Sequence, residues 1–333
     1  MRLTRRAFVS AAGSLVVFGR RIRAAEFVFS QYHNQVDRSP LHRQLVAMWN
    51  DIRAETRGRV DTQVFAQNNN IPGSDPQALR MLVAGEIQFF TLMGGVLDRV
   101  VPTTAVQDMP FAYRSAEHAF QVMDGPLGAY LRSEMAAKGI QGFATGVFDN
   151  GMRQISIVAR PVVAPGDLAG IRMRTPDAPL IADTFRAFGA EPVTVNSADI
   201  YDALKNGRVD AQENPLALIE LFRIYEVVRY ISMTNHIWSG FNQLAHLDTW
   251  RRLPSDIQAV IERNVAKHAR LQRQAQAAFN ASLRPTLARR GPVFNDVMPA
   301  AFRRQLSGVY AKWKRELGSR CWSLLEAGTG TLA

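Results

Sequence analysis

Cysteine and long apolar runs are scarce in this sequence. Its single cysteine, Cys321, allows no intrachain disulfide and no cysteine-based metal site. Beyond residue 25 no uncharged apolar stretch reaches the ~20 residues that cross a bilayer. The 6 histidines show no metal-ligand spacing such as H-E-x-x-H, so no metal site is predicted. The 333 residues must therefore be held together by hydrophobic cores, and their number is sufficient for two domains.

Acidic residues are fewer than basic ones, 29 against 40, which gives a formal net charge of +11. Six of these net positive charges are arginines in residues 1–25, which contain no acid, so +5 remains for the rest. Those other basic residues are scattered, without a basic helix that carries interleaved aromatic residues. The sequence therefore does not predict nucleic-acid binding.

Residues 1–25 resemble an export signal. The letters TRRAF at residues 4–8 resemble a twin-arginine motif, and the apolar run at residues 9–18 is too short to span a bilayer. We expect cleavage near Ala24 or Ala25 and localisation in the periplasm. An uncleaved basic arm is the alternative.

Residues 170–216 carry the clearest fold signal. Apolar runs at residues 171–174, 192–195 and 209–212 are separated by two helical patterns. Strands that alternate with helices are typical of an α/β fold with a parallel sheet. In such open sheets, ligands bind beyond the carboxyl ends of the strands.

Polar side chains stand at the carboxyl ends of these three strands. Arg174 ends the first strand, Ser197 follows the second, and Asn214 follows the third. The planar guanidinium of arginine matches a carboxylate in two hydrogen bonds. The spacing therefore predicts a crevice for a small organic anion, with a structural ion pair of Arg174 as the alternative.

Several segments are similar to the substrate-binding proteins of TRAP (tripartite ATP-independent periplasmic) transporters. The matching stretches are GSDPQALRMLVAGEIQFF, FDNGMRQISI, GIRMRTPDAP, GAEPVTVNSADIYDALKNGRVDAQENPL and YEVVRYISMTNHIW, which cover roughly residues 70–255 in the family's order. The D-A-Q-E-N-P element followed by T-N-H is specific to this family. The resemblance implies a two-domain, type II-like periplasmic binding protein of α/β class, with a hinge and a long helix that bridges the domains.

The implied domain boundaries follow from the points where the chain crosses between domains. We expect domain I at residues 26–150 plus 240–280, domain II at 151–239 plus 281–325, and a tail at 326–333 that is disordered from Gly328 onward. The bridging helix is predicted from Ile257 toward Leu283, with a break at Pro285.

The resemblance also implies a set of ligand-binding residues. It assigns the carboxylate to Arg174 and Arg153. Some family members that bind sialic acid have an acid near the position of Met93, so Met93 points to a less polar ligand. The other implied contacts are Asn34 and Asp75 in domain I, and Ser197, Asn214, His236 and Trp238.

The function implied by the resemblance is capture of a small organic carboxylate by clamp closure and its delivery to TRAP membrane permease subunits. We expect a monocarboxylate with an apolar or aromatic body; a C4-dicarboxylate or a sugar acid is the alternative. An exported α/β enzyme is a weaker alternative. No G-x-S-x-G elbow, P-loop, Cys–His pair or G-x-G-x-x-G occurs in a suitable context, so neither an enzyme nor a cofactor is predicted.

Overall fold

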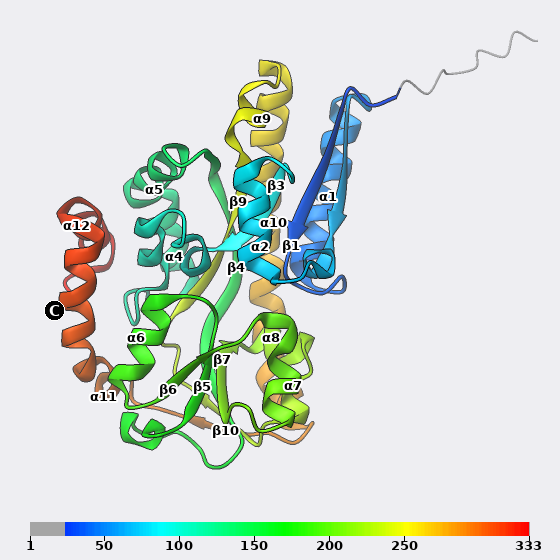
Figure 1. Cartoon of the computed structure of the whole chain (residues 1–333). Helices are drawn as coiled ribbons and strands as arrows, with labels where there is room; N and C mark the ends of the chain where they lie inside the picture. Colours follow the sequence, from blue (N-terminus) through cyan, green and yellow to red (C-terminus); the bar gives the residue numbers. More distant parts are fainter. Residues whose placement is uncertain (1–23, 333) are drawn as a thin grey trace, which may run out of the picture.

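The computed structural model describes residues 24–332, so the predicted twin-arginine signal lies almost entirely outside the described residues (Figure 1). Two lobes lie one above the other in this view, and each is built on part of one sheet. Lobe I contains β1 (Phe27–His33), β2 (Val60–Phe65), β3 (Phe89–Met93), β9 (Trp238–His246) and the first part of β4 (Ile140–Ile157). Lobe II contains the end of β4, β5 (Arg172–Thr175), β6 (Glu191–Thr194), β7 (Ala211–Pro215), β8 (Tyr230–Met233) and β10 (Val293–Asp296).

The sheet confirms the α/β class. Its strands follow the order β2-β1-β3-β9-β4-β7-β5-β6, and β8 pairs with both β4 and β10. In lobe I, β1 is parallel to β2 and β3. In lobe II, β5 is parallel to β6 and β7. The carboxyl ends of parallel neighbours lie at the same edge, which is where α/β proteins bind ligands.

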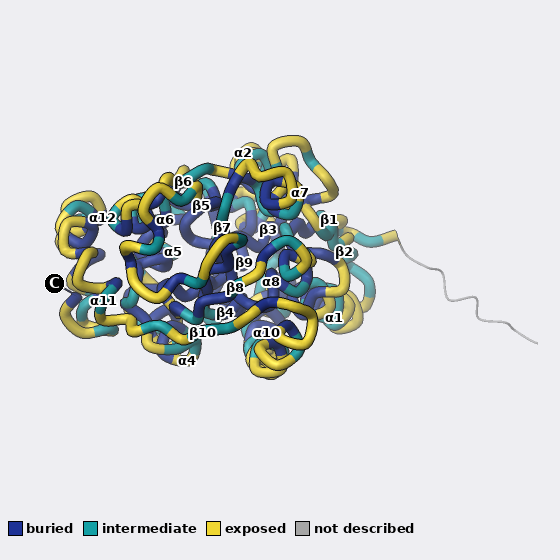
Figure 2. The backbone as a smooth tube through the Cα atoms, turned by 90° about the horizontal axis from the view of Figure 1, so that it is seen from below, coloured by how far each residue is buried: buried dark blue, intermediate teal, exposed yellow. Residues whose placement is uncertain are grey.

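Helices cover the sheet of each lobe. Lobe I carries α1 (Pro40–Glu55), α2 (Ser74–Ala84), α3 (Gly94–Leu97), α4 (Ala116–Asp124), α5 (Pro126–Ala136) and α9 (Leu247–Arg251), and lobe II carries α6 (Pro179–Ala187), α7 (Ile200–Lys205), α8 (Leu216–Leu221) and α11 (Pro299–Arg303). The Ser39 side chain caps α1, and Pro40 occupies its first turn. Figure 2 shows buried backbone concentrated in the central strands and exposed backbone along the outer turns.

Strand β4 passes through both lobes and forms part of the hinge. It pairs with β9 up to Met152 and with β7 from Arg153 onward. An irregularity in the β4–β9 register lies between Asp149 and Gly151. Gly151 has φ 108°, and a Cβ there would stand 2.5 Å from the amide nitrogen of Asn280. Only glycine fits this crossing without strain.

Helix α10 (Ser255–Ala288) is the predicted bridging helix and runs along both lobes (Figure 1). The Gln272 side chain bonds both the amide and the carbonyl of Asp149, at 2.7 Å each, which joins the helix to the hinge. The predicted break at Pro285 is wrong. This proline lies in the last turn, where few backbone hydrogen bonds depend on it, and buried Leu283 and Leu287 hold that turn in place.

The predicted tail is also replaced by ordered structure. Helix α12 (Ser307–Thr329) continues well beyond residue 326, and Leu332 is buried. The backbone carbonyl of Gly328 lies 2.9 Å from Nε2 of His118 on α4. Packing against lobe I therefore orders a segment whose small, uncharged residues suggested disorder.

The two lobes touch each other on the ligand side of the sheet. Val36, which follows β1, packs against Leu218 and Leu221 of α8. Arg99 of lobe I forms a salt bridge with Asp177, which precedes α6. Because these contacts join residues of opposite lobes, the structure describes a closed arrangement.

Candidate functional site

Arg174 lies on β5 with its side chain almost completely buried. The residue is 3 % exposed, and its Nε donates a hydrogen bond to the carbonyl oxygen of Val195 at 2.8 Å. Within residues 24–332 no carboxylate comes within salt-bridge distance of its guanidinium. Burial lowers the pKa of Arg174 to about 9, partly opposed by Glu213, so it is still a cation at neutral pH. A buried cation without a counter-charge is suited to an anionic ligand.

Arg153, at the start of the β4–β7 pairing, has a different environment. Its Nε and Nη2 bind the two carboxylate oxygens of Glu213, and Nη2 also donates to the Glu213 carbonyl at 2.8 Å. Nη1 donates to the hydroxyl of Ser239 at 3.2 Å. The charge of Arg153 is thus neutralised within the protein. Sequence reasoning missed Glu213 as its partner, although this residue belongs to the D-A-Q-E-N-P element.

Glu213 also contacts His236. His236 Nε2 lies 3.3 Å from a carboxylate oxygen of Glu213, and its Nδ1 lies 2.7 Å from the hydroxyl of Thr234. Burial lowers the pKa of His236, and Glu213 only partly opposes this. We therefore assign a neutral ring that donates to Glu213 and accepts from Thr234. Burial by itself raises the pKa of Glu213, but Arg153 and His236 outweigh it and hold the carboxylate ionised.

Lobe I contributes a polar group to the same region. Asp75 accepts hydrogen bonds from Asn34 at 2.7 Å and from Asn68 at 2.6 Å. Burial raises the pKa of Asp75, against these hydrogen bonds and the charge of Arg174. The charge of Arg174 therefore acts on Asp75 although the two residues belong to different lobes.

Asn68 is a site residue that sequence reasoning did not single out. It is fully buried, and its Oδ1 has no hydrogen-bond partner among the described residues. It belongs to the turn Ala66–Asn70, in which residues 67–70 all have positive φ between 49° and 55°. Asparagine tolerates this left-handed region better than most residues, and the triple asparagine is the signal that could have indicated it. Such strained segments cluster at ligand-binding sites.

The structure places the remaining predicted residues as follows. Met93 ends β3 and is 5 % exposed, Asn214 on β7 donates to Gln212 at 2.6 Å, and Ser197 is half-buried after β6. Trp238 lies elsewhere. It is fully buried, donates to Asp149 at 3.1 Å and packs edge-on against Tyr113 and Phe120. These contacts place Trp238 beside the hinge, and its predicted ligand contact stays a prediction.

Asp108 is a second residue that sequence reasoning missed. It ends the turn Pro102–Asp108, is fully buried, and faces Gly95, where a Cβ would stand 1.9 Å from its Oδ2. Burial raises the pKa of Asp108 to about 7, with Arg153 opposing this and Glu213 adding to it. The residue is therefore close to the Arg153–Glu213 pair and partly protonated at neutral pH.

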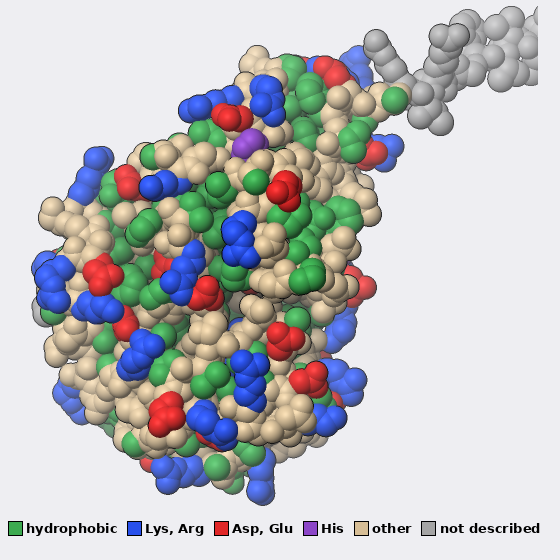
Figure 3. Space-filling model, in the orientation of Figure 1, with side chains coloured by type: hydrophobic (Ala, Val, Ile, Leu, Met, Phe, Trp, Pro, Cys, Tyr) green, Lys and Arg blue, Asp and Glu red, His purple; other side chains and the backbone are tan. Residues whose placement is uncertain are grey.

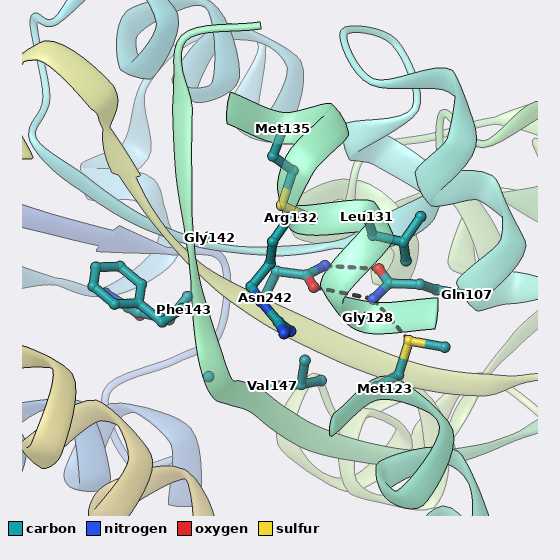
Figure 4. Close-up of a pocket in the computed structure, with 12 residues that line it drawn as sticks. Gln107, Met123, Gly128, Leu131, Arg132, Met135, Gly142, Phe143, Val147 and Asn242 are labelled. Carbon is teal, nitrogen blue, oxygen red and sulfur yellow. Dashed lines mark hydrogen bonds between the residues drawn. The ribbon is translucent and has the colours of Figure 1, made fainter. Parts of the chain in front are cut away.

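A small cavity between α5, β4 and β9 is separate from this site (Figure 4). Its volume is about 10 Å³, which holds one water molecule at most. Gln107 and Asn242 line it and exchange two side-chain hydrogen bonds, of 2.7 and 3.0 Å. This cavity is too small for an organic ligand, so the convergence of Arg174, Glu213 and Asp75 is the better candidate.

The sequence and the fold are similar to those of known solute-binding proteins. The sequence model of the DctP family, bacterial extracellular solute-binding protein family 7, matches residues 30–316. A solute-binding protein of Roseobacter denitrificans is 29% identical over 279 residues, 84% of each chain. The crystal structure of that protein with bound L-galactonate has a TM-score of 0.84 and 25% identity, and the match covers 92% of this chain and 99% of that one. An uncharacterized protein of Sinorhizobium fredii is 35% identical over 233 residues, which are 70% of this chain but only 42% of that relative's length.

Proposed function

The chain belongs to the DctP family, whose members are the solute-binding proteins of TRAP transporters, and on that premise we propose that it captures an organic acid through Arg174 and delivers it to a membrane permease. The observation that carries this proposal is the buried guanidinium of Arg174, which has no carboxylate partner among the described residues. Leaving such a charge unpaired is costly, and a ligand carboxylate removes that cost. The two arginines and the amides around them suit binding rather than acid–base catalysis near neutral pH.

The charges of the site favour a monocarboxylate. Glu213 neutralises Arg153, and the ring of His236 is neutral, so Arg174 is the cation left for the ligand. A second ligand carboxylate would approach Asp75 or Asp108 instead of a free cation. We therefore propose that a monocarboxylate fits this site better than a C4-dicarboxylate does.

The body of the ligand is better matched by a hydroxylated chain than by an apolar one. Asn34, Asn68 and Asp75 offer amide and carboxylate groups on the lobe I side, beside the apolar Met93. The Roseobacter relative was solved with L-galactonate, which is a hydroxylated monocarboxylate. We propose a sugar acid of this kind, and the expectation of an apolar or aromatic body is not confirmed.

Binding would proceed by closure of the two lobes around the acid. Arg174 belongs to lobe II and Asp75 to lobe I, so a ligand between them contacts both lobes. An acid that binds the closed form better than the open form shifts the population toward closure. The crossings of β4, β9 and α10 supply the hinge.

A thermal-shift panel tests this function. The panel contains galactonate, galacturonate and glucuronate, the dicarboxylates succinate and malate, and benzoate as an apolar monocarboxylate. We expect a sugar acid to stabilise the protein by about 2.7 kcal/mol at ~100 times its dissociation constant. Mass spectrometry should recover the acid unchanged. Conversion of the acid, or stabilisation by succinate alone, would overturn the proposal.

We also propose that residues 1–25 direct export by the twin-arginine route to the periplasm, where family members function. A reporter fused to this segment should reach the periplasm, and changing both Arg5 and Arg6 to Lys should stop it. Continued export of the double variant would exclude this route.

A further inference from the structure

A second cavity lies where lobe I, lobe II and α12 meet. Its volume is about 270 Å³. Asp98, Arg99 and Pro102 line it from lobe I, Pro179 from α6, and Trp313 and Glu316 from α12. Helix α12 stands alongside both lobes in Figure 1, and its side chains at spacings of three and four residues face the same way. The cavity thus has walls from three parts of the molecule.

Asp98 is the unusual group in this cavity. It is only 8 % exposed, its Oδ1 has no hydrogen-bond partner, and no donor among residues 24–332 bonds its carboxylate. A buried carboxylate without donors is unfavourable unless a cation or a proton reaches it. Burial raises the pKa of Asp98 to about 8, with Arg99 opposing and Asp108 and Asp177 adding to the effect.

The cations around Asp98 are already paired with other carboxylates. Its neighbouring cation, Arg99, is already bonded to Asp177. Glu316 stands at the rim with its side chain half exposed, and Lys312 lies 3.8 Å from it while bonding Asp183 at 2.6 Å. The cavity therefore has two carboxylates, Asp98 and Glu316, that can receive a positive charge from outside.

From these contacts we infer that the cavity at Asp98 binds a small organic cation of the alkylammonium type. The ammonium group binds Asp98, and its short apolar chain lies against Pro102, Pro179 and Trp313. A hard metal ion would need about six oxygen ligands, whereas two lining residues, Asp98 and Glu316, carry carboxylates. The Trp313 indole already attracts one ammonium group, because the Nζ of Lys312 lies 5.6 Å from its ring centroid. On α12, Trp313 is held in place because its Nε1 donates to Asp183 at 3.0 Å.

Occupation of this cavity would favour the closed arrangement of the lobes. Pro179 belongs to lobe II and Asp98 to lobe I, so the cation contacts both lobes at once. A ligand that binds the closed form preferentially is coupled to any other ligand that does the same. The inference does not depend on which acid binds at Arg174.

The test uses the full chain with n-butylammonium chloride as the probe. Melting temperature and calorimetry are followed at a pH above 8, where Asp98 is ionised, with sodium and magnesium chloride at matched ionic strength. We expect butylammonium to raise the melting temperature saturably and beyond either salt. Asp98→Asn, which keeps the shape of the side chain, should weaken butylammonium affinity at least about tenfold, and Glu316→Gln about two- to threefold.

The matched control is Asp248→Asn, which changes an exposed acid on α9 and should leave butylammonium affinity unchanged. The inference is overturned if sodium chloride stabilises the parent protein as much as butylammonium does. It is also overturned if Asp98→Asn and Glu316→Gln both bind butylammonium as the parent does. These measurements need no organic acid, so their failure would leave the proposed function untouched.

Discussion

The two buried arginines of the site differ in what surrounds them and not in how deeply they lie. Arg153 is 1 % exposed and Arg174 is 3 % exposed. Glu213 binds Arg153 through both carboxylate oxygens, whereas Arg174 bonds only the backbone carbonyl of Val195. Two arginines that occupy the same region can therefore have different tasks. We propose that the first holds the strands in place and that the second is the anchor for a ligand.

The largest effect is expected where this pairing is broken. Glu213→Gln leaves the charges of Arg153 and Arg174 buried together without compensation. Removing one member of a buried pair costs about 3–5 kcal/mol, so urea denaturation should show a loss of that size. The control is Glu220→Gln, which breaks the 2.6 Å surface pair with Arg290 and should cost about 0–1 kcal/mol. Equal losses in both variants would mean that the Arg153–Glu213 pair has no special role.

The second effect concerns Arg174 and should appear in binding. Arg174→Ala should weaken the affinity for the best acid of the panel by about 2–5 kcal/mol, roughly thirty-fold to several thousand-fold. Arg174→Lys should lie toward the low end of this range because lysine keeps the charge but loses the planar fork. Arg174→Ala should still fold, since this variant removes a buried charge.

Arg172→Ala is the matched control for this prediction. Arg172 lies two residues earlier on β5, is exposed, and pairs with Asp210 at 2.6 Å. Calorimetry should show affinity within about three-fold of the parent for this variant. If Arg174→Ala also stays within that limit, Arg174 is structural and another group anchors the acid.

Much of the fold could be predicted because its elements are local patterns. The apolar runs predicted as strands at residues 171–174, 192–195 and 209–212 correspond to β5, β6 and β7. The errors arose where distant contacts outweigh local preference. Buried leucines keep α10 helical through Pro285, where a break was predicted. His118 contacts the end of α12, where a disordered tail was predicted.

The site could be predicted in part, for the same reason. Strand ends indicated Arg174, and the resemblance indicated Asn34 and Asp75, which the structure brings toward one another. The partners of these residues were not evident, because Glu213 and Asp108 reach the site only through the pairing of strands and turns far apart in the sequence. The contacts of Trp238 with Tyr113 and Phe120 were likewise not evident, because they join residues far apart in the sequence.

The third prediction concerns the protonation of Asp108. It tests whether this acid differs from Glu213, which is ionised in the folded protein. The pKa of Asp108 is raised to about 7 in the folded protein, whereas its ordinary value is 3.8. Between these two pH values the folded protein keeps a proton that the unfolded chain has released. Stability from this group therefore falls as pH rises from about 4 to about 7. Asp108→Asn should remove that slope and be more stable than the parent at about pH 8, by on the order of 1–3 kcal/mol.

Urea denaturation of both proteins at about pH 5 and about pH 8 checks this. The gap between the two proteins is the informative quantity, because Asp98 and Asp149 also have raised pKa values, about 8 and about 6, and keep part of the slope in the variant. Parallel stability curves would show that Asp108 is ionised in the folded protein throughout. It would then resemble Glu213, as a carboxylate held by Arg153.

The smallest effect is expected for a surface ion pair that joins the two lobes. Arg99 and Asp177 pair across the lobes with side chains 49% and 29% exposed, so the pair contributes only about 0–1 kcal/mol. Since it exists only in the closed form, Arg99→Gln should lower the apparent acid affinity by less than about five-fold, and added salt should shrink the difference. Arg186→Gln, which breaks a pair with Asp183 inside α6, should leave affinity unchanged. Calorimetry at low and high salt measures these affinities, and solution scattering follows closure. Equal affinities for the two variants would mean that the lobes close without help from the Arg99–Asp177 pair.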